Sequence, residues 1–213
     1  MIRGAIERAM RSLLLALSRR RFLGRLAVRL PFTRPMVARF VAGESLEAAL
    51  PAIETLHEAG FGTTVDLLGE AVSDEDAARA AATAYVDALH RLADAGLDLN
   101  VSVKLSQMGL ELGPQVARQN AARVLAAASE LGAFVRIDME DHTTTDATLE
   151  LWRQLRPVMA GQGDVGLVIQ AALRRSEADL PGLIADGARI RLCKGAYKEP
   201  AAVAYPDKAE VDA

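Results

Sequence analysis

The sequence has one cysteine, few aromatic residues and no long apolar run. A single cysteine in 213 residues excludes an internal disulfide, which is typical of a protein in a reducing, cytoplasmic compartment. Cys193 lies in an apolar stretch, so we interpret it as a small buried hydrophobe rather than a nucleophile. Because aromatic residues make up only 4% of the chain, alanine, leucine and valine must fill most of the core. No stretch approaches the roughly 20 apolar residues of a transmembrane helix.

Two phosphate-binding signatures are also missing. No G-x-G-x-x-G follows a predicted strand, and no G-x-x-x-x-G-K-[ST] occurs, so Rossmann-type dinucleotide binding and P-loop chemistry lose support. The run D-M-E-D-H at residues 138–142 resembles a set of metal ligands. In a strand, however, Asp138 and Glu140 share one face while Asp141 points away. With three histidines in the whole chain, we predict no metal site.

The charge is unevenly distributed. Residues 1–39 hold ten arginines and one acid, Glu7, a balance of +9, so the net charge of -3 leaves -12 on the remainder. Three interpretations of this amphipathic segment stay open. A basic amphipathic helix through residues 3–21 would lie on an anionic membrane, or its leucines would pack on the following domain with the arginines solvated. Nucleic-acid binding is the third, and the acidic bulk of the chain argues against it.

From residue 45 onward, helical and extended patterns alternate about five times, with spacings near those of a βα unit. We expect strands at 61–68, 97–105, 133–138, 165–170 and 189–194. We expect helices at 45–60, 73–96, 114–131, 148–159 and 176–187, with Ser73 and Thr143–Thr145 as caps. The strands are apolar on both faces, which favours a parallel sheet covered by helices. A doubly wound sheet and a (β/α)8 barrel both remain open, and the missing Rossmann signature favours the barrel.

A polar residue closes each predicted strand: Asp66, Lys104, Asp138, Gln170, and the pair Arg191 and Lys194. In a barrel these residues would all lie at the carboxyl-end mouth, where barrel enzymes keep their chemistry. Each alone could merely form an ion pair or bind a loop amide, but five consecutive strands that end this way indicate a site.

The last of these stretches, R-I-R-L-C-K-G-A-Y-K-E-P at residues 189–200, is the most informative. A cation inside a strand is costly to bury unless it is paired or faces a site. Gly195 and Ala196 then allow the backbone to approach whatever Arg191 and Lys194 hold, because glycine has no Cβ. The stretch therefore predicts a site for an anionic or electron-rich ligand.

Four motifs, in the same order, make the chain similar to the proline dehydrogenase family. They are V-S-V-K-L-S at 101–106, V-R-I-D-M-E-D at 135–141, L-V-I-Q-A at 167–171 and R-I-R-L-C-K-G-A-Y at 189–197, with L-L-G-E at 67–70 in addition. The resemblance implies a distorted (β/α)8 TIM-type barrel preceded by helices, with non-covalent FAD. It implies oxidation of L-proline to Δ1-pyrroline-5-carboxylate, with electrons passed to a membrane quinone.

The resemblance also implies roles at the substrate. Lys104 would hold the proline carboxylate as a point charge, and Asp138 would flank the substrate at the mouth. Arg191 would contact the isoalloxazine edge, where a planar and permanently charged guanidinium is suited to stabilise the reduced ring. Asp138 and Arg191 would thus be the catalytic residues.

The remaining carried-over roles concern the cofactor. Met139 and Gln170 would line the flavin beside Arg191. Lys194, Gly195 and Ala196 would cradle the rest of it. The protein would supply position and charge, since the flavin carries the hydride step.

The chain departs from the family after the fifth strand, because it stops at Ala213. The family's later strands and a final helix with a pair of arginines have no counterpart. We therefore divide the chain into an N-terminal helical segment, 1–58, and an incomplete barrel domain, 59–213, and we expect residues 1–213 alone not to turn over proline. Two alternatives stay open: a Schiff-base aldolase-like barrel with Lys104 or Lys194 as nucleophile, and a non-catalytic remnant that binds a partner or a membrane through residues 1–34.

Overall fold

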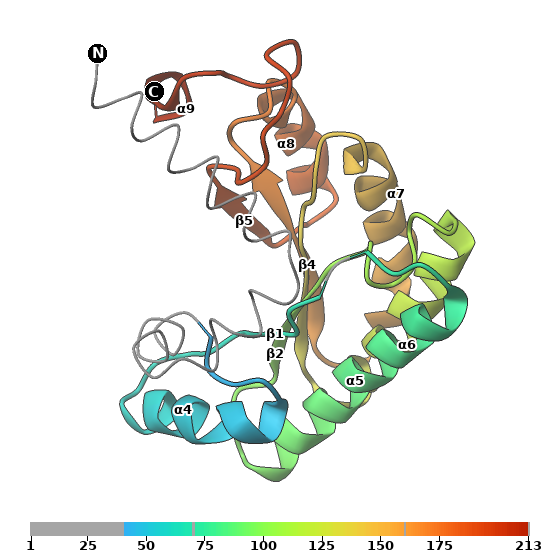
Figure 1. The fold of residues 1–213 in the computed structure, drawn as a ribbon, viewed down its shortest axis with the longest axis vertical. Helices are drawn as coiled ribbons and strands as arrows, with labels where there is room; N and C mark the ends of the chain where they lie inside the picture. The colour runs from blue at the N-terminus through green and yellow to red at the C-terminus, as the bar shows by residue number, and fades with distance from the viewer. Residues whose placement is uncertain (1–40, 70, 160, 213) are drawn as a thin grey trace, which may run out of the picture. The chain divides into compact units, whose positions relative to one another are not determined.

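The computed structural model describes residues 41–69, 71–159 and 161–212 (Figure 1). The chain divides into two compact units, Met1–Thr55 and Leu56–Ala213, and each is described by itself. Helix α4 (Leu46–Glu58) starts in the first unit after Ser45, whose Oγ accepts a hydrogen bond from the Ala48 amide at 3.3 Å, and its last residues belong to the second unit. The basic segment and Glu70 lie outside the described residues, so the predicted helix at the N-terminus and the boundary at residue 58 stay predictions.

The second unit is built on one sheet of five parallel strands. They are β1 (Val65–Asp66), β2 (Asn100–Val103), β3 (Phe134–Ile137), β4 (Asp164–Gln170) and β5 (Ile190–Cys193). The strands pair in sequence order, each with the next one along the chain. A doubly wound sheet reverses its strand order at a switch point, so that alternative is wrong. The predicted barrel-type α/β fold is confirmed.

Helices connect successive strands and gather on one side of the sheet. They are α5 (Glu75–Asp94), α6 (Pro114–Leu131), α7 (Thr145–Leu155) followed by the 3₁₀ helix η1 (Arg156–Met159), and α8 (Ser176–Ala185). Figure 1 shows α5, α6 and α7 side by side along this face. A short helix that we did not predict, α9 (Lys208–Asp212), lies near the end of the chain. None of the helices among the described residues is both long enough and apolar enough to cross a membrane.

The two predicted helix caps have different outcomes: Ser73 is wrong, whereas Thr144 has the predicted cap position but makes no side-chain cap bond. Asp74, not Ser73, caps α5, because its Oδ1 accepts a hydrogen bond from the Ala77 amide at 2.8 Å. A carboxylate at this position also interacts favourably with the helix dipole. At α7, Thr144 occupies the cap position without a side-chain cap bond. Its hydroxyl instead donates to the carbonyl oxygen of Asp141 at 2.9 Å.

The two faces of the sheet differ sharply in polarity. Val101, Val135 and Val165 lie in register across β2, β3 and β4, and all three are buried against the helices. Beneath them Trp152 of α7 is fully buried, and its Nε1 donates a hydrogen bond to the Val165 carbonyl oxygen at 3.1 Å. Because side chains alternate along a strand, the opposite face carries the intervening residues. Most of these are polar: Asp66, Asn100, Ser102, Arg136, Asp164, Gln170 and Arg191, with Phe134, Gly166, Val168 and Cys193 between them.

Replacement of Trp152 by alanine tests the apolar face. We expect Trp152→Ala to lower the free energy of unfolding by about 3–5 kcal/mol, because it leaves a cavity and removes the bond to Val165. Leu68→Ala is the control, since this side chain is 77% exposed and should change stability by less than about 0.5 kcal/mol. Denaturant unfolding followed by circular dichroism measures both. Tryptophan fluorescence does not serve here, because Trp152 is the only tryptophan and the variant removes it. Similar losses in the two variants would contradict this account of the core.

Candidate active site

A row of alternating charges lies at the carboxyl ends of the strands. Lys104 Nζ donates a hydrogen bond to Asp66 Oδ2 at 2.8 Å and lies 3.7 Å from Asp138 Oδ2. Arg191 Nη2 donates to the other oxygen of Asp138, Oδ1, at 2.7 Å. The row therefore links β1, the residue after β2, the residue after β3, and β5. Three of the predicted site residues, Lys104, Asp138 and Arg191, are in direct contact.

A buried hydroxyl fixes the centre of this row. Ser102 on β2 is only 3% exposed, and its Oγ donates to Asp138 Oδ1 at 2.7 Å while accepting from Arg191 Nη2 at 3.0 Å. Asp138 therefore receives two donors on Oδ1 and faces the Lys104 ammonium with Oδ2. A carboxylate held from three sides has little freedom to rotate, so the spacing between Lys104 and Arg191 is fixed.

Tyr85 supports the row from α5. Its hydroxyl lies 3.4 Å from Asp66 Oδ1 and 3.1 Å from Gln107 Oε1. Burial raises the pKa of Tyr85, and the charge of Asp66 raises it further, so the hydroxyl stays protonated. The sequence analysis assigned no site role to this residue. The available signal was that a fully buried tyrosine needs a partner for its hydroxyl.

Lys104 remains a cation in this setting. Burial alone would lower its pKa, but the hydrogen bond to Asp66 and the charges of Asp66, Asp138 and Glu140 raise the pKa above its ordinary value of 10.5. The pKa of Lys194 is raised too, chiefly by its hydrogen bond with Asp212. A Schiff-base lysine needs an unprotonated amine. The arrangement therefore gives no support to the aldolase-like alternative.

Gln170 ends β4 and lies close to Gly195, in the loop after β5. It is buried, and its Nε2 donates to the Glu140 carbonyl oxygen at 2.7 Å. Gly195 has a φ of 113°, and a Cβ there would lie 3.0 Å from Ala172 Cβ and 3.3 Å from Gln170 Oε1. Only glycine lets the loop pass this closely. The structure thus brings Gln170 and Gly195 together, as we expected of two residues at one mouth.

The other predicted cofactor residues lie apart from the charge row. Met139, directly after Asp138, is buried in the hydrophobic core. Lys194 is exposed and forms an ion pair with Asp212 of α9, and Ala196 is exposed. Among the described residues, the contacts of these three give no direct link to Lys104, Asp138 or Arg191.

A second pair, also missed in the sequence, connects two loops at the same edge. The Glu199 side chain is buried and accepts a hydrogen bond from the His142 amide at 2.9 Å, and it also contacts Nδ1 of His142. This joins the loop after β3 to the loop after β5. Tyr197 lies between Gly195 and Glu199 in the chain. Its pKa is raised, mainly by partial burial and secondly by the charge of Glu140. The loop that holds Gly195 is therefore fixed at Glu199.

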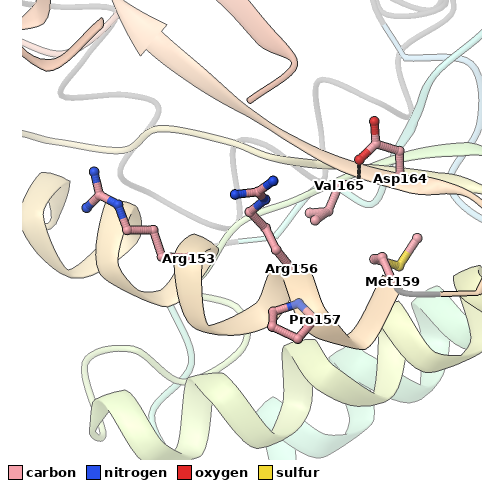
Figure 2. A pocket seen from close by; sticks show the side chains of 6 residues that line it. All are labelled: Arg153, Arg156, Pro157, Met159, Asp164 and Val165. Carbon is pink, nitrogen blue, oxygen red and sulfur yellow. Dashed lines mark hydrogen bonds between the residues drawn. The ribbon is translucent and has the colours of Figure 1, made fainter. Parts of the chain in front are cut away.

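Two cavities lie at the opposite edge of the sheet. One, of about 390 Å³, is lined by Arg153, Arg156, Pro157, Met159, Asp164 and Val165 at the start of β4 (Figure 2). The other, of about 420 Å³, is lined by residues 62–64 before β1 and residues 98–100 at the start of β2. Neither contains a member of the charge row. Barrel enzymes keep their chemistry at the carboxyl edge, so we assign the site to the charge row.

The chain is similar to known proteins over most of its length. A model of the proline dehydrogenase family matches residues 49–203. Proline dehydrogenase from Deinococcus radiodurans is 43% identical over 184 residues, which cover 83% of this chain and 58% of that protein. Proline dehydrogenase 2 from Bacillus subtilis is 33% identical over 202 residues, or 95% of this chain and 65% of that protein. The chain thus spans about three fifths of these relatives.

A solved structure agrees with the fold. Proline utilization A from Bdellovibrio bacteriovorus, inactivated by N-propargylglycine, matches with a TM-score of 0.76 and 27% identity. The match covers 90% of this chain and 24% of that one.

The pKa of Lys104 tests the charge row. We expect Asp66→Asn to lower this pKa, because the variant removes the negative charge and the strongest hydrogen-bond acceptor beside the ammonium. A pH titration of ¹³C-dimethylated lysines by NMR measures it, with Asp146→Asn, an exposed carboxylate paired with Arg175, as the control. An unchanged Lys104 pKa in Asp66→Asn would contradict the contact. Since the folded-state pKa is raised, the contribution of Lys104 to stability is complete below pH 10.5 and is lost as the pH rises through the raised value.

Proposed function

The chain belongs to the proline dehydrogenase family, and from this premise we propose that it forms the site for FAD-dependent oxidation of L-proline to Δ1-pyrroline-5-carboxylate. A quinone is the proposed electron acceptor. The observation that supports this most is the row Lys104, Asp138 and Arg191, which presents charges of both signs at the carboxyl edge of a barrel-type sheet. A cyclic amino acid that carries both a carboxylate and an ammonium group matches such a row.

Substrate binding in this proposal depends on Lys104. Its ammonium is held at Asp66 and stays protonated, so it attracts the proline carboxylate. The carboxylate of Asp138 lies next to it and provides the opposite charge for the substrate nitrogen. Because Ser102 and Arg191 orient Asp138 before the substrate arrives, less orientational entropy is lost on binding.

Two features of the chain fit a flavin. Arg191 Nε is buried and has no hydrogen-bond partner among the described residues, so a donor is left over at the centre of the proposed site. Gly195 lets the loop after β5 lie directly against Gln170, a residue of the proposed flavin lining. When bound, FAD would accept the hydride removed from proline. The fixed charge of Arg191 would stabilise the negative charge that accompanies reduction.

The cellular placement is also a proposal. The single cysteine favours a cytoplasmic protein, and the ten arginines of residues 1–39 favour peripheral contact with an anionic inner membrane leaflet. Such contact would bring the site close to a membrane quinone. The packing alternative for the same segment predicts no such contact.

The proposed function is tested with two proteins: residues 1–213, and the same residues joined to the C-terminal part of the Deinococcus radiodurans relative. Both receive FAD and L-proline, and dye reduction is followed without oxygen. We expect the chimera to reduce the dye with L-proline but not with D-proline, and to be inactivated by N-propargylglycine. A flavin-loaded chimera that does not oxidise L-proline would overturn the proposal. Turnover by residues 1–213 alone would overturn only the expectation that this part is incomplete.

Arg191→Met tests the role of the guanidinium in the active chimera. We expect turnover to fall at least tenfold and the flavin reduction potential to fall as well, because the charge that stabilises the reduced ring is gone. The KM for proline should change less, since Lys104 remains. Arg191→Lys keeps a charge but not the planar fork, so its turnover and reduction potential should lie between those of Arg191→Met and the unmodified chimera. Spectroelectrochemical titration measures the potential, and an unchanged value in Arg191→Met would exclude this role.

Vesicle binding tests the basic segment. We expect residues 1–213 to bind phosphatidylglycerol vesicles, with about 1 kcal/mol of binding free energy for each arginine near the surface. Binding should weaken as salt rises, because the attraction is screened. Deletion of residues 1–39 is the control and should abolish it. Equal binding to neutral vesicles, or none to anionic ones, would favour the packing alternative.

A further inference from the structure

Arg136 is a charged residue on the polar face of the sheet to which neither the motifs nor the family resemblance gave a role. It lies on β3, two residues before Asp138. Its Nη1 donates hydrogen bonds to the carbonyl oxygens of Leu167 at 3.3 Å and Arg189 at 2.8 Å. Leu167 belongs to β4, and Arg189 directly precedes β5. The side chain therefore crosses β4 and reaches the start of the last strand.

Gly166 makes this crossing possible. It pairs with Arg136 in the register of β3 and β4. A Cβ at Gly166 would lie 2.8 Å from Arg136 Nη1 and 2.4 Å from the Arg189 carbonyl oxygen, closer than atoms tolerate. Gly166 is not among the glycines with positive φ, so the requirement at this position is for space rather than for an unusual backbone angle.

An aromatic ring holds the two neighbouring guanidinium groups. Arg136 Cζ lies 4.6 Å and Arg189 Cζ 4.4 Å from the centre of the Phe134 ring. Arg189 also lies 3.6 Å from Asp164. Cation–π contacts of this kind restrict a long side chain. The residue that precedes β5 is thus held through its carbonyl oxygen and its side chain, and Arg191 follows two positions later on the same face.

The three arginines of this face repel one another, which indicates that the positive charge of Arg136 has a role of its own. Arg136, Arg189 and Arg191 share one face, and the pKa of Arg136 is lowered, first by burial and then by the charges of Arg191 and Arg189. A neutral side chain at this position would avoid this repulsion. The positive potential at Arg191 is therefore higher than Arg191 alone would produce.

We propose that Arg136 is a positioning residue for Arg191. By crossing β4 at Gly166 it fixes the start of β5, and its charge raises the positive potential at the point where Arg191 meets an electron-rich partner. The effect of Arg136 on the flavin rests on the proposed function, whereas its effect on the position of β5 does not.

The first test measures the chemical shift and the solvent exchange of the Arg191 Nε–H group in protein without flavin. The variants are Arg136→Met, Arg136→Lys and Gly166→Ala, and the control is Arg123→Met, which loses one surface hydrogen bond to Thr83. The ¹H–¹⁵N resonance of Arg191 Nε, assigned through Arg191→Lys, reports its surroundings. We expect Arg136→Met and Gly166→Ala to shift this resonance and to speed its exchange with solvent at least tenfold. The control should leave it unchanged, and Arg136→Lys should restore part of the protection. Circular dichroism verifies folding, and an unchanged resonance in both folded variants overturns the proposal.

The second test separates positioning from simple bracing. In the flavin-loaded chimera, Arg136→Met should shift the redox equilibrium about tenfold towards the oxidised flavin, about 30 mV for a two-electron couple. Arg136→Lys keeps the charge and should keep the potential. A resonance change in Arg136→Met with an unchanged potential would reduce Arg136 to a structural brace and overturn the proposal. A chimera that binds no flavin contradicts the proposed function instead, and the Arg191 resonance then decides this inference.

Discussion

The carboxylate of Asp138 is the contact on which the proposed site depends. It receives Ser102 from β2 and Arg191 from β5, and it faces Lys104. Without it, two cations would face each other on a partly buried surface, and removing one partner of such a pair is costly. The charges at this edge are therefore coupled: each is tolerable because its neighbour has the opposite sign. Asp66 of β1 supplies a second negative charge to Lys104, and the neutral hydroxyl of Tyr85 connects Asp66 to α5.

The alternation of side chains along the strands separates stability from chemistry. Val101, Val135 and Val165 face the helices and bury apolar area, while Ser102, Arg136 and Gly166 occupy the other face. A slip of one residue in any strand would exchange the two sets. The apolar face therefore fixes the register, and the register in turn decides which polar groups meet. The pairing of Arg136 with Gly166 exists only in this register.

The sequence predicted the order of the elements and the sheet edge at which we propose the site. Apolar runs identified all five strands, and the polar residues that end them included Lys104, Asp138 and Arg191. Lengths were less well predicted: the extended run 61–68 contains only the two residues of β1. The role of Arg136 was missed, although it is a cation inside a strand, as Arg191 is. Its hydrogen-bond partners lie on β4 and just before β5, and the space for its side chain exists because Gly166 has none. These features are distant in the sequence, so no local pattern around Arg136 could reveal its role. The same holds for Tyr85, whose contacts depend on how α5 packs.

The strand order follows the order of synthesis, and this has a consequence for how the molecule forms. Every strand pairs with the one made just before it, so each βα unit can dock on the growing sheet as it emerges. The polar contacts behave differently. Ser102 and Arg191 are 89 residues apart in the chain, and their bond closes only after four strands are already paired. The framework can thus assemble progressively, whereas the charge row is completed in a single late step, when β5 is added.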